Sequence, residues 1–251
     1  MGERTSHAPG TFSWADLSTT DTEGAKAFYT GLFGWDFEDN PIPDDGVYTM
    51  LLKDGKSVAA LSSTVSEGQP AAWNSYVTVE SADAAAAATR EHGGTVVMEA
   101  FDVMDVGRMA VLQDPNDAFL SVWQPGTSIG AERVNEPGAL TLNQLNTSDA
   151  ARAQEFYSGV FGWRFEEVAG GDQAYWGIYN GDRLNGGMME QLPAFWLTYF
   201  GTDDIDDDAA KIAELGGTVI VPPMPVPGGH ILVAQDPQVA VFGLLSGRFD
   251  D

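Results

Sequence analysis

An eight-residue stretch occurs twice in the chain, and this repeat constrains the fold more than any other feature of the sequence. Residues 28–35 read FYTGLFGW, and residues 156–163 read FYSGVFGW, 128 positions later. The period is far longer than the roughly 20–50 residues of a solenoid repeat. The sequence therefore predicts one module of about 120 residues that has been duplicated and fused.

Each copy of the repeat ends a predicted amphipathic helix. Asp21 and Asp149 are favourable residues for the helix starts, and a glycine stands before the final tryptophan of each copy. A second, alanine-rich helix and alternating apolar strands follow in each half. We therefore expect an α+β fold of four βαβββ units. The predicted parts are a loose arm at 1–10, a first module at 11–126 with a turn at 40–46, a linker at 127–137, and a second module at 138–248 in which 222–229 form a loop.

The composition of the chain limits which partners it is expected to bind and in which cellular compartment it is expected. The net charge is −25, with 37 acidic residues against 12 Lys and Arg, which argues against binding nucleic acid or an anionic membrane. The chain has no cysteine, no apolar run near the roughly 18 residues of a membrane span, and no hydrophobic signal-peptide core. We expect a cytoplasmic protein, either a monomer or a homodimer.

The repeated motif also resembles that of a known group of proteins. An Asp, six residues, then Phe-Tyr-x-x-x-Phe-Gly-Trp, together with an Asp-Pro turn before the last strand of each half (Asp114-Pro115 and Asp236-Pro237), is similar to the vicinal oxygen chelate superfamily. That superfamily includes glyoxalases, bleomycin-resistance proteins and extradiol dioxygenases. The chain looks most like its two-module actinobacterial glyoxalase-like or hydroxylase-like branch. The resemblance implies cup-shaped mixed sheets with a ligand in the concavity.

The resemblance further implies where a metal ion would be bound. Metal-dependent members place a His seven residues before the helix-opening Asp and a Glu seven residues after the Asp of the Asp-Pro turn. Trp14, Ser121, Leu142 and Gly243 stand at those four positions. Divalent transition metals are usually held by imidazoles, carboxylates or thiolates. We therefore expect no metal ion and no other cofactor, and no metal-dependent glyoxalase or dioxygenase activity.

The cup of the first module is expected to be aromatic with one carboxylate. Strand alternation places Trp14 beside Asp16 and Ser121 beside Trp123 on one face. Asp16 is either a general base or hydrogen-bond acceptor for a ligand in the cup, or a structural residue that pairs with Arg108 or caps nearby backbone groups, and both interpretations remain open. The residues expected to bind ligand in this cup are Trp14, Tyr48, Tyr76, Arg108, Ser121 and Trp123.

The second cup is expected to carry less charge. Leu142, Gln144, Gly243 and Leu245 take the positions of Trp14, Asp16, Ser121 and Trp123. Tyr175 and Tyr199 correspond to the two tyrosines of the first cup, and His230 corresponds to Arg108. Gln144, Tyr175 and Tyr199 are predicted ligand contacts, and His230 is a second candidate acid–base group.

Three functions remain possible from the sequence. The first is metal-independent binding of a drug-sized, aromatic small molecule, as in antibiotic sequestration. The second is a metal-independent tailoring enzyme (an isomerase, cyclase or hydroxylase-like protein) that acts on a natural product and uses Asp16. The third is an interaction protein whose cups are filled by their own tryptophans and tyrosines.

Overall fold

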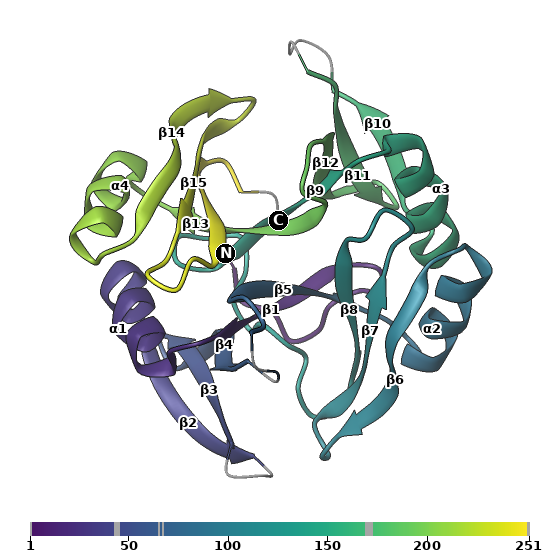
Figure 1. The fold of residues 1–251 in the computed structure, drawn as a ribbon, viewed down its shortest axis with the longest axis horizontal. Coiled ribbons are helices and arrows are strands. Elements are labelled where there is room, and N and C mark those ends of the chain that lie inside the picture. Colours follow the sequence, from purple (N-terminus) through teal and green to yellow (C-terminus); the bar gives the residue numbers. More distant parts are fainter. Residues whose placement is uncertain (1, 43–45, 65, 67, 169–172, 250–251) are drawn as a thin grey trace.

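The computed structural model describes residues 2–42, 46–64, 66, 68–168 and 173–249. Within this part of the chain, sixteen strands form two eight-stranded mixed sheets, one for each module (Figure 1). The expected α+β fold of two tandem modules, each of two βαβββ units, is confirmed.

The strand order of the first sheet is β2-β3-β4-β1-β5-β8-β7-β6. The two βαβββ units of the first module thus pair with each other through β1 and β5, the two central strands of the sheet. The elements of the first module are β1 (Phe12–Thr19), α1 (Thr22–Phe33), β2 (Asp36–Ile42), β3 (Gly46–Lys53), β4 (Lys56–Ser63), β5 (Ala72–Thr78), α2 (Ala82–Glu91), β6 (Thr95–Val103), β7 (Gly107–Gln113) and β8 (Phe119–Pro125).

The second sheet repeats this order as β10-β11-β12-β9-β13-β16-β15-β14. Its elements are β9 (Leu140–Thr147), α3 (Ala150–Phe161), β10 (Arg164–Glu167), β11 (Tyr175–Asn180), β12 (Arg183–Glu190), β13 (Phe195–Thr202), α4 (Ile205–Glu214), β14 (Thr218–Val226), β15 (Gly229–Gln235) and β16 (Val241–Gly247).

The residues predicted to begin and end α1 and α3 do so in the structure. The side chain of Asp21 accepts a hydrogen bond from the amide of Gly24 at 3.0 Å, and Asp149 does the same for Arg152. Gly34 and Gly162 follow the helices with φ of 68° and 71°, a left-handed conformation that suits glycine. Local sequence therefore fixes both ends of these helices.

The two modules share their cores. Helix α1 contacts α4, and α2 contacts α3, so each helix pair joins the modules (Figure 1). Phe28 and Tyr29 of α1 lie in one buried cluster with Phe242 and Leu244 of β16. The helix-bearing faces of the sheets are thus buried against one another, which leaves the opposite faces as the cups.

Two equivalent hydrogen-bond chains cross between the modules. Tyr29 of α1 donates to Asp236 in the Asp-Pro turn of the second module at 3.0 Å and accepts from Trp73 at 2.9 Å. Tyr157 of α3 makes the same two bonds, to Asp114 at 3.0 Å and from Trp196 at 2.9 Å. The repeated motif therefore anchors each module to the turn of the other.

Three local predictions were wrong. The arm is not loose, because Gly2 is buried and the carbonyl of Gly10 accepts a 2.8 Å hydrogen bond from Trp163. The predicted loop at 222–229 instead continues β14 to Val226, since β14 is an edge strand, where prolines need not donate to a ladder. Likewise, β2 extends into the stretch predicted to be a turn, as far as Ile42.

No helix of the described residues is long and apolar enough to cross a bilayer.

Candidate functional site

The first cup is built on neighbouring strands whose side chains lie in register. Trp14 of β1 is opposite Tyr76 of β5, and Tyr76 is opposite Ser121 of β8. Asp16 lies two residues after Trp14 on β1, on the same face of the strand, and is opposite Asn74. Residues in register on paired strands share a face, so the structure brings Trp14, Asp16, Tyr76 and Ser121 together as the sequence predicts.

Asp16 is the centre of a hydrogen-bond network on this floor. Its carboxyl accepts from the hydroxyls of Tyr76 at 2.7 Å and Tyr48 at 3.1 Å, and from the side-chain amide of Asn74 at 2.9 Å. The indole of Trp14 donates in turn to the Tyr48 hydroxyl at 3.0 Å. Asp16 is 7% exposed, and burial raises its pKa, opposed by its hydrogen bonds from Asn74, Tyr76 and Tyr48.

Asn74 was missed by the sequence reasoning, although its strand alternation gave a usable signal. It shares a face of β5 with Tyr76, and it also donates to the hydroxyl of Ser18 at 3.1 Å. The amide thus holds Asp16 and Ser18 in place along β1.

The raised pKa of Asp16 leads to a test of its protonation. Because the folded-state pKa of Asp16 lies above the ordinary value of 3.8, the protonated carboxyl stabilises the folded state. This contribution to the free energy of unfolding is complete below pH 3.8 and is lost as the pH rises through the folded-state pKa. Asparagine cannot titrate. We therefore expect the free energy of unfolding of the wild type to fall relative to that of Asp16→Asn as the pH rises above about 4 in denaturant titrations. Asp182→Asn, in an exposed turn, controls for the loss of one formal charge, and parallel curves for wild type and Asp16→Asn would contradict the expectation.

Arg108 does not join the first cup, contrary to the prediction. It lies on the same face of β7 as Ala110 and Leu112, which pack in the cluster with α2. Its guanidinium bonds Asp83 of α2 at 2.9 and 3.0 Å and Asp102 at 2.9 Å. The ion pairs therefore hold Arg108 on the helix side of the sheet.

His230 is excluded from the second cup for the same reason. It shares a face of β15 with Leu232 and Ala234, which are buried in the cluster with α4, and its own side chain is exposed. The structure therefore gives no support to His230 as an acid–base group in the cup.

The second cup repeats the register of the first with different chemistry. Leu142 of β9 is opposite Tyr199 of β13, which is opposite Gly243 of β16. Gln144 is opposite Gly187 of β12, and its amide nitrogen donates to Asn146 at 3.0 Å. The structure thus places Gln144 and Tyr199 on one floor, and burial raises the pKa of Tyr199 far above its usual value.

Tyr175 completes the second cup from β11. Its hydroxyl lies over Gly187, where a β-carbon on the glycine would approach it to 1.8 Å. Burial raises the pKa of Tyr175 to about 12, so its phenol is protonated at neutral pH.

Rings fill both floors, while the outer walls remain apolar and exposed. Trp14 and Tyr76 are each 7% exposed, and Tyr199 is 1% exposed. On the wall of the first cup, Met98 and Phe101 of β6 are 46% and 39% exposed and in register with Val111 and Met109 of β7. The first cup therefore combines a buried aromatic floor with an accessible apolar wall on the same face.

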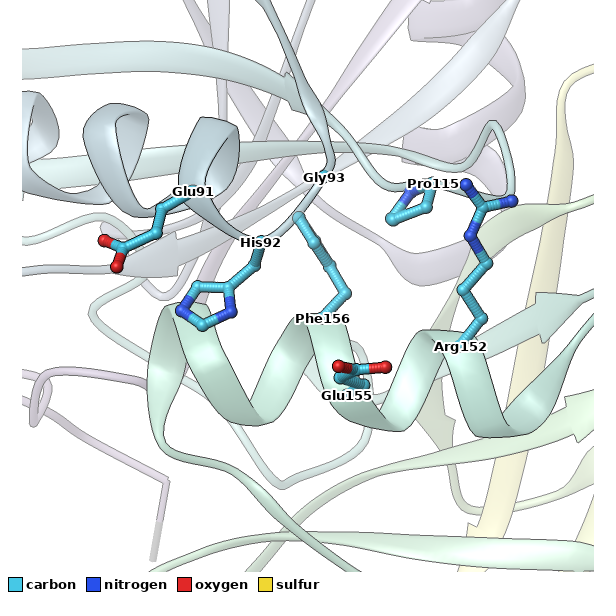
Figure 2. Close-up of a pocket in the computed structure, with 7 residues that line it drawn as sticks. All are labelled: Glu91, His92, Gly93, Pro115, Arg152, Glu155 and Phe156. Atoms are coloured by element: carbon cyan, nitrogen blue, oxygen red, sulfur yellow. The ribbon is translucent and has the colours of Figure 1, made fainter.

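Two surface hollows lie outside the cups. One, of about 310 Å³, is at the seam of α2 and α3, where Phe156 of α3 lies between His92 and Arg152 (Figure 2). The other, of about 400 Å³, lies between residues 3–5 of the arm, the start of β4 and residues 127–130 of the linker. Their linings are polar and largely exposed, and neither contains a residue that was predicted to bind ligand.

The residues at the family's metal positions do not fit a divalent cation. The Trp14 indole is a donor already used on Tyr48, while Leu142 and Gly243 have no side-chain ligand atom. The carboxyl of Asp16 lies on the same floor as Trp14, and three donors already occupy it. Among the described residues, no group of three or more His, Asp or Glu side chains is placed to hold a metal ion.

Comparison with known proteins matches this geometry. Residues 11–120 and 139–240 match the sequence model of the family described as "Glyoxalase/Bleomycin resistance protein/Dioxygenase superfamily". "Putative glyoxylase CFP32" of Mycobacterium tuberculosis is 42% identical over 98% of both chains. "Anthracycline biosynthesis protein DauV" of Streptomyces sp. is 33% identical over 97% of this chain and 96% of its own.

Solved structures share the fold at low sequence identity. The Mn(II)-bound glyoxalase from Novosphingobium aromaticivorans superposes with a TM-score of 0.70 at 16% identity, covering 100% of this chain and 86% of its own. The 2,3-dioxygenase LapB from Pseudomonas sp. KL28 gives a TM-score of 0.68 at 14% identity, covering 97% and 94%. These similarities concern the architecture, because identity is too low to carry over residue roles.

Proposed function

Because the chain belongs to the glyoxalase/bleomycin resistance protein/dioxygenase superfamily, we propose that it binds a drug-sized aromatic small molecule in a cup of this fold without a metal ion. The observation that carries the proposal is the replacement of the family's metal ligands by Trp14, Ser121, Leu142 and Gly243 on floors that are otherwise aromatic. Apolar walls with a few placed polar groups are the usual chemistry of small-molecule sites.

The relatives suggest which ligands to try first. DauV and DnrV are named for anthracycline biosynthesis, and anthracyclines are flat aromatic compounds of the size that a cup would accept. An anthracycline and several unrelated aromatic natural products form a suitable panel. Sequestration predicts that calorimetry detects binding and that mass spectrometry recovers each ligand chemically unchanged.

A second candidate, a metal-independent tailoring enzyme, is favoured by one observation. Asp16 is a buried carboxyl with a raised pKa that touches two phenol hydroxyls, an arrangement able to hold or transfer a proton. Conversion of any panel compound would support this candidate. Loss of conversion with retained binding in Asp16→Asn would assign the acid–base role to Asp16, and unchanged conversion would remove it.

The metal-free binding mode has its own test. We expect the protein, purified without chelator, to carry much less than one equivalent of Mn, Fe, Ni or Zn per chain, because the cups lack a ligand set. Elemental analysis measures the content directly. One equivalent of a single metal, together with loss of ligand binding after chelation, would refute the proposed binding mode.

A further inference from the structure

The two phenols of the second cup carry hydroxyls that the protein itself does not use. Neither Tyr175 nor Tyr199 makes a side-chain hydrogen bond to any other residue in the part of the chain that the structure describes. Neither hydroxyl is among the fully buried side-chain oxygens without a partner in the described residues, so both hydroxyls remain accessible although Tyr199 as a whole is only 1% exposed. Both phenols remain protonated at neutral pH, since burial raises both pKa values and the neighbouring Tyr175 raises that of Tyr199 further. The second cup thus offers two free donors.

The first cup shows what these hydroxyls do when they are engaged. The equivalent tyrosines, Tyr48 and Tyr76, both donate to Asp16. Gln144 replaces Asp16 in the second module, and its amide nitrogen is turned to Asn146 and Met189. The first floor is therefore internally satisfied, whereas in the second the donors have lost their acceptor.

Glycines on the neighbouring strands make room for the two phenols of the second floor. A β-carbon on Gly243 would meet the ring of Tyr199 at 2.2 Å, and one on Gly187 would meet the hydroxyl of Tyr175 at 1.8 Å. Both phenols therefore lie against the backbone of a neighbouring strand, in space that any other residue would fill. Because Tyr199 is only 1% exposed and its hydroxyl is not fully buried, Tyr199 presents its hydroxyl, and not the face of its ring, to a ligand.

The remaining polar group on this floor is an acceptor. With the nitrogen of Gln144 committed to Asn146, its carbonyl oxygen has no donor among the described residues. Leu142, Leu245 and the glycines complete a floor that bears no charge. A charged ligand would be poorly solvated here, because nothing on the floor neutralises it.

We infer that the second cup, and not the first, is the ligand site, and that it takes a flat, uncharged aromatic molecule with a carbonyl oxygen beside a hydroxyl group. Tyr175 and Tyr199 donate to the carbonyl oxygen, and the Gln144 carbonyl accepts from the hydroxyl. This inference rests on the proposed binding function and adds the location of the site and the ligand's polar pattern.

Matched tyrosine variants locate the site. The probe is quinizarin, a planar hydroxyquinone, titrated by its visible absorbance into wild type, Tyr175→Phe, Tyr199→Phe, Tyr48→Phe and Tyr76→Phe. We expect each second-cup variant to weaken binding about tenfold, since it removes one hydrogen bond to the ligand. The first-cup variants should change affinity by less than about twofold. Thermal unfolding of each variant identifies losses caused by misfolding.

A second probe tests the acceptor. Anthraquinone has the carbonyl oxygens of quinizarin without its hydroxyls. Gln144→Leu should weaken quinizarin binding about tenfold and leave anthraquinone binding unchanged, because only quinizarin donates to residue 144. Equal losses for both probes would overturn the assigned role of Gln144.

The outcomes separate this inference from the function on which it rests. If wild type binds quinizarin but affinity falls in Tyr48→Phe and Tyr76→Phe instead, or in none of the four variants, the second-cup site is wrong while the binding function stands. If wild type binds neither quinizarin nor any compound of the natural-product panel, the proposed function itself fails.

Discussion

Replacing Asp236 with alanine is expected to lower the free energy of unfolding by about 3–5 kcal/mol, measured by denaturant titration. The carboxyl accepts from the Tyr29 hydroxyl at 3.0 Å and from the amides of Gln238 and Ala240 at 2.9 Å each. Asp236 is 3% exposed and Tyr29 is fully buried, so the substitution leaves buried donors that water cannot reach.

A double-mutant cycle isolates the contact between the modules. Tyr29→Phe alone should cost about 1–2 kcal/mol, and much less when Asp236 is already alanine, because the bond it removes is then absent. Asp114→Ala with Tyr157→Phe provides the equivalent cycle on the other side of the molecule. A loss below about 1 kcal/mol for Asp236→Ala would show that this crossing bond does not stabilise the fold.

Trp163→Ala is expected to destabilise the protein by about 3–5 kcal/mol, as deletion of a large buried aromatic side chain does. The indole is 2% exposed and packs against Phe12 at 5.4 Å and Tyr157 at 5.5 Å between ring centroids. Its nitrogen also donates to the carbonyl of Gly10. Its loss therefore opens a cavity and removes one of the hydrogen bonds that hold the arm to the second module, while those from Asn180 to Pro9 and from Asn185 to Gly10 remain.

Two further measurements support this interpretation. Limited proteolysis should cut residues 2–9 faster in Trp163→Ala than in wild type, because the Gly10 carbonyl then keeps only its hydrogen bond from Asn185. Phe119→Ala, which removes a ring that is 54% exposed, should cost less than about 1 kcal/mol. Similar losses for both variants would mean that burial of Trp163 is not the source of its effect.

The local structure could be predicted from the sequence because its causes are local. Asp21 and Gly34 define the ends of α1 through their own side-chain and backbone preferences. The turn at Asp54-Gly55 follows from residues that tolerate positive φ, observed at 51° and 72°. Because the motif is repeated, the same reasoning predicts the corresponding helix ends and turn in the second module.

Only those parts of the site that follow from strand alternation or from the internal repeat could be predicted from the sequence. They correctly placed Trp14, Asp16, Tyr76 and Ser121 on one face. They failed for Arg108, because alternation separates two faces without saying which one a helix covers. The small apolar neighbours Ala110 and Leu112 were the signal that this face packs against α2.

The contacts between the modules had no signal in the sequence. Tyr29 and Asp236 are 207 residues apart, and each has a sufficient local explanation as a core aromatic residue and a turn residue. Only the three-dimensional structure shows that each is the partner of the other. The unpaired hydroxyl of Tyr199 was equally hidden, since pairing depends on the orientation of Gln144.

The crossed bonds from Tyr29 to Asp236 and from Tyr157 to Asp114 have the reciprocity of an isologous interface, in which contact i–j is always accompanied by contact j–i. In a homodimer of single modules, any substitution appears in both subunits at once, so both cups must keep the same residue. Fusion into one chain removes that coupling. The chain keeps the dimer-like contacts intact, while position 16 is an aspartate that pairs with both tyrosines of its cup and position 144 is a glutamine that, among the described residues, leaves the hydroxyls of Tyr175 and Tyr199 without an acceptor.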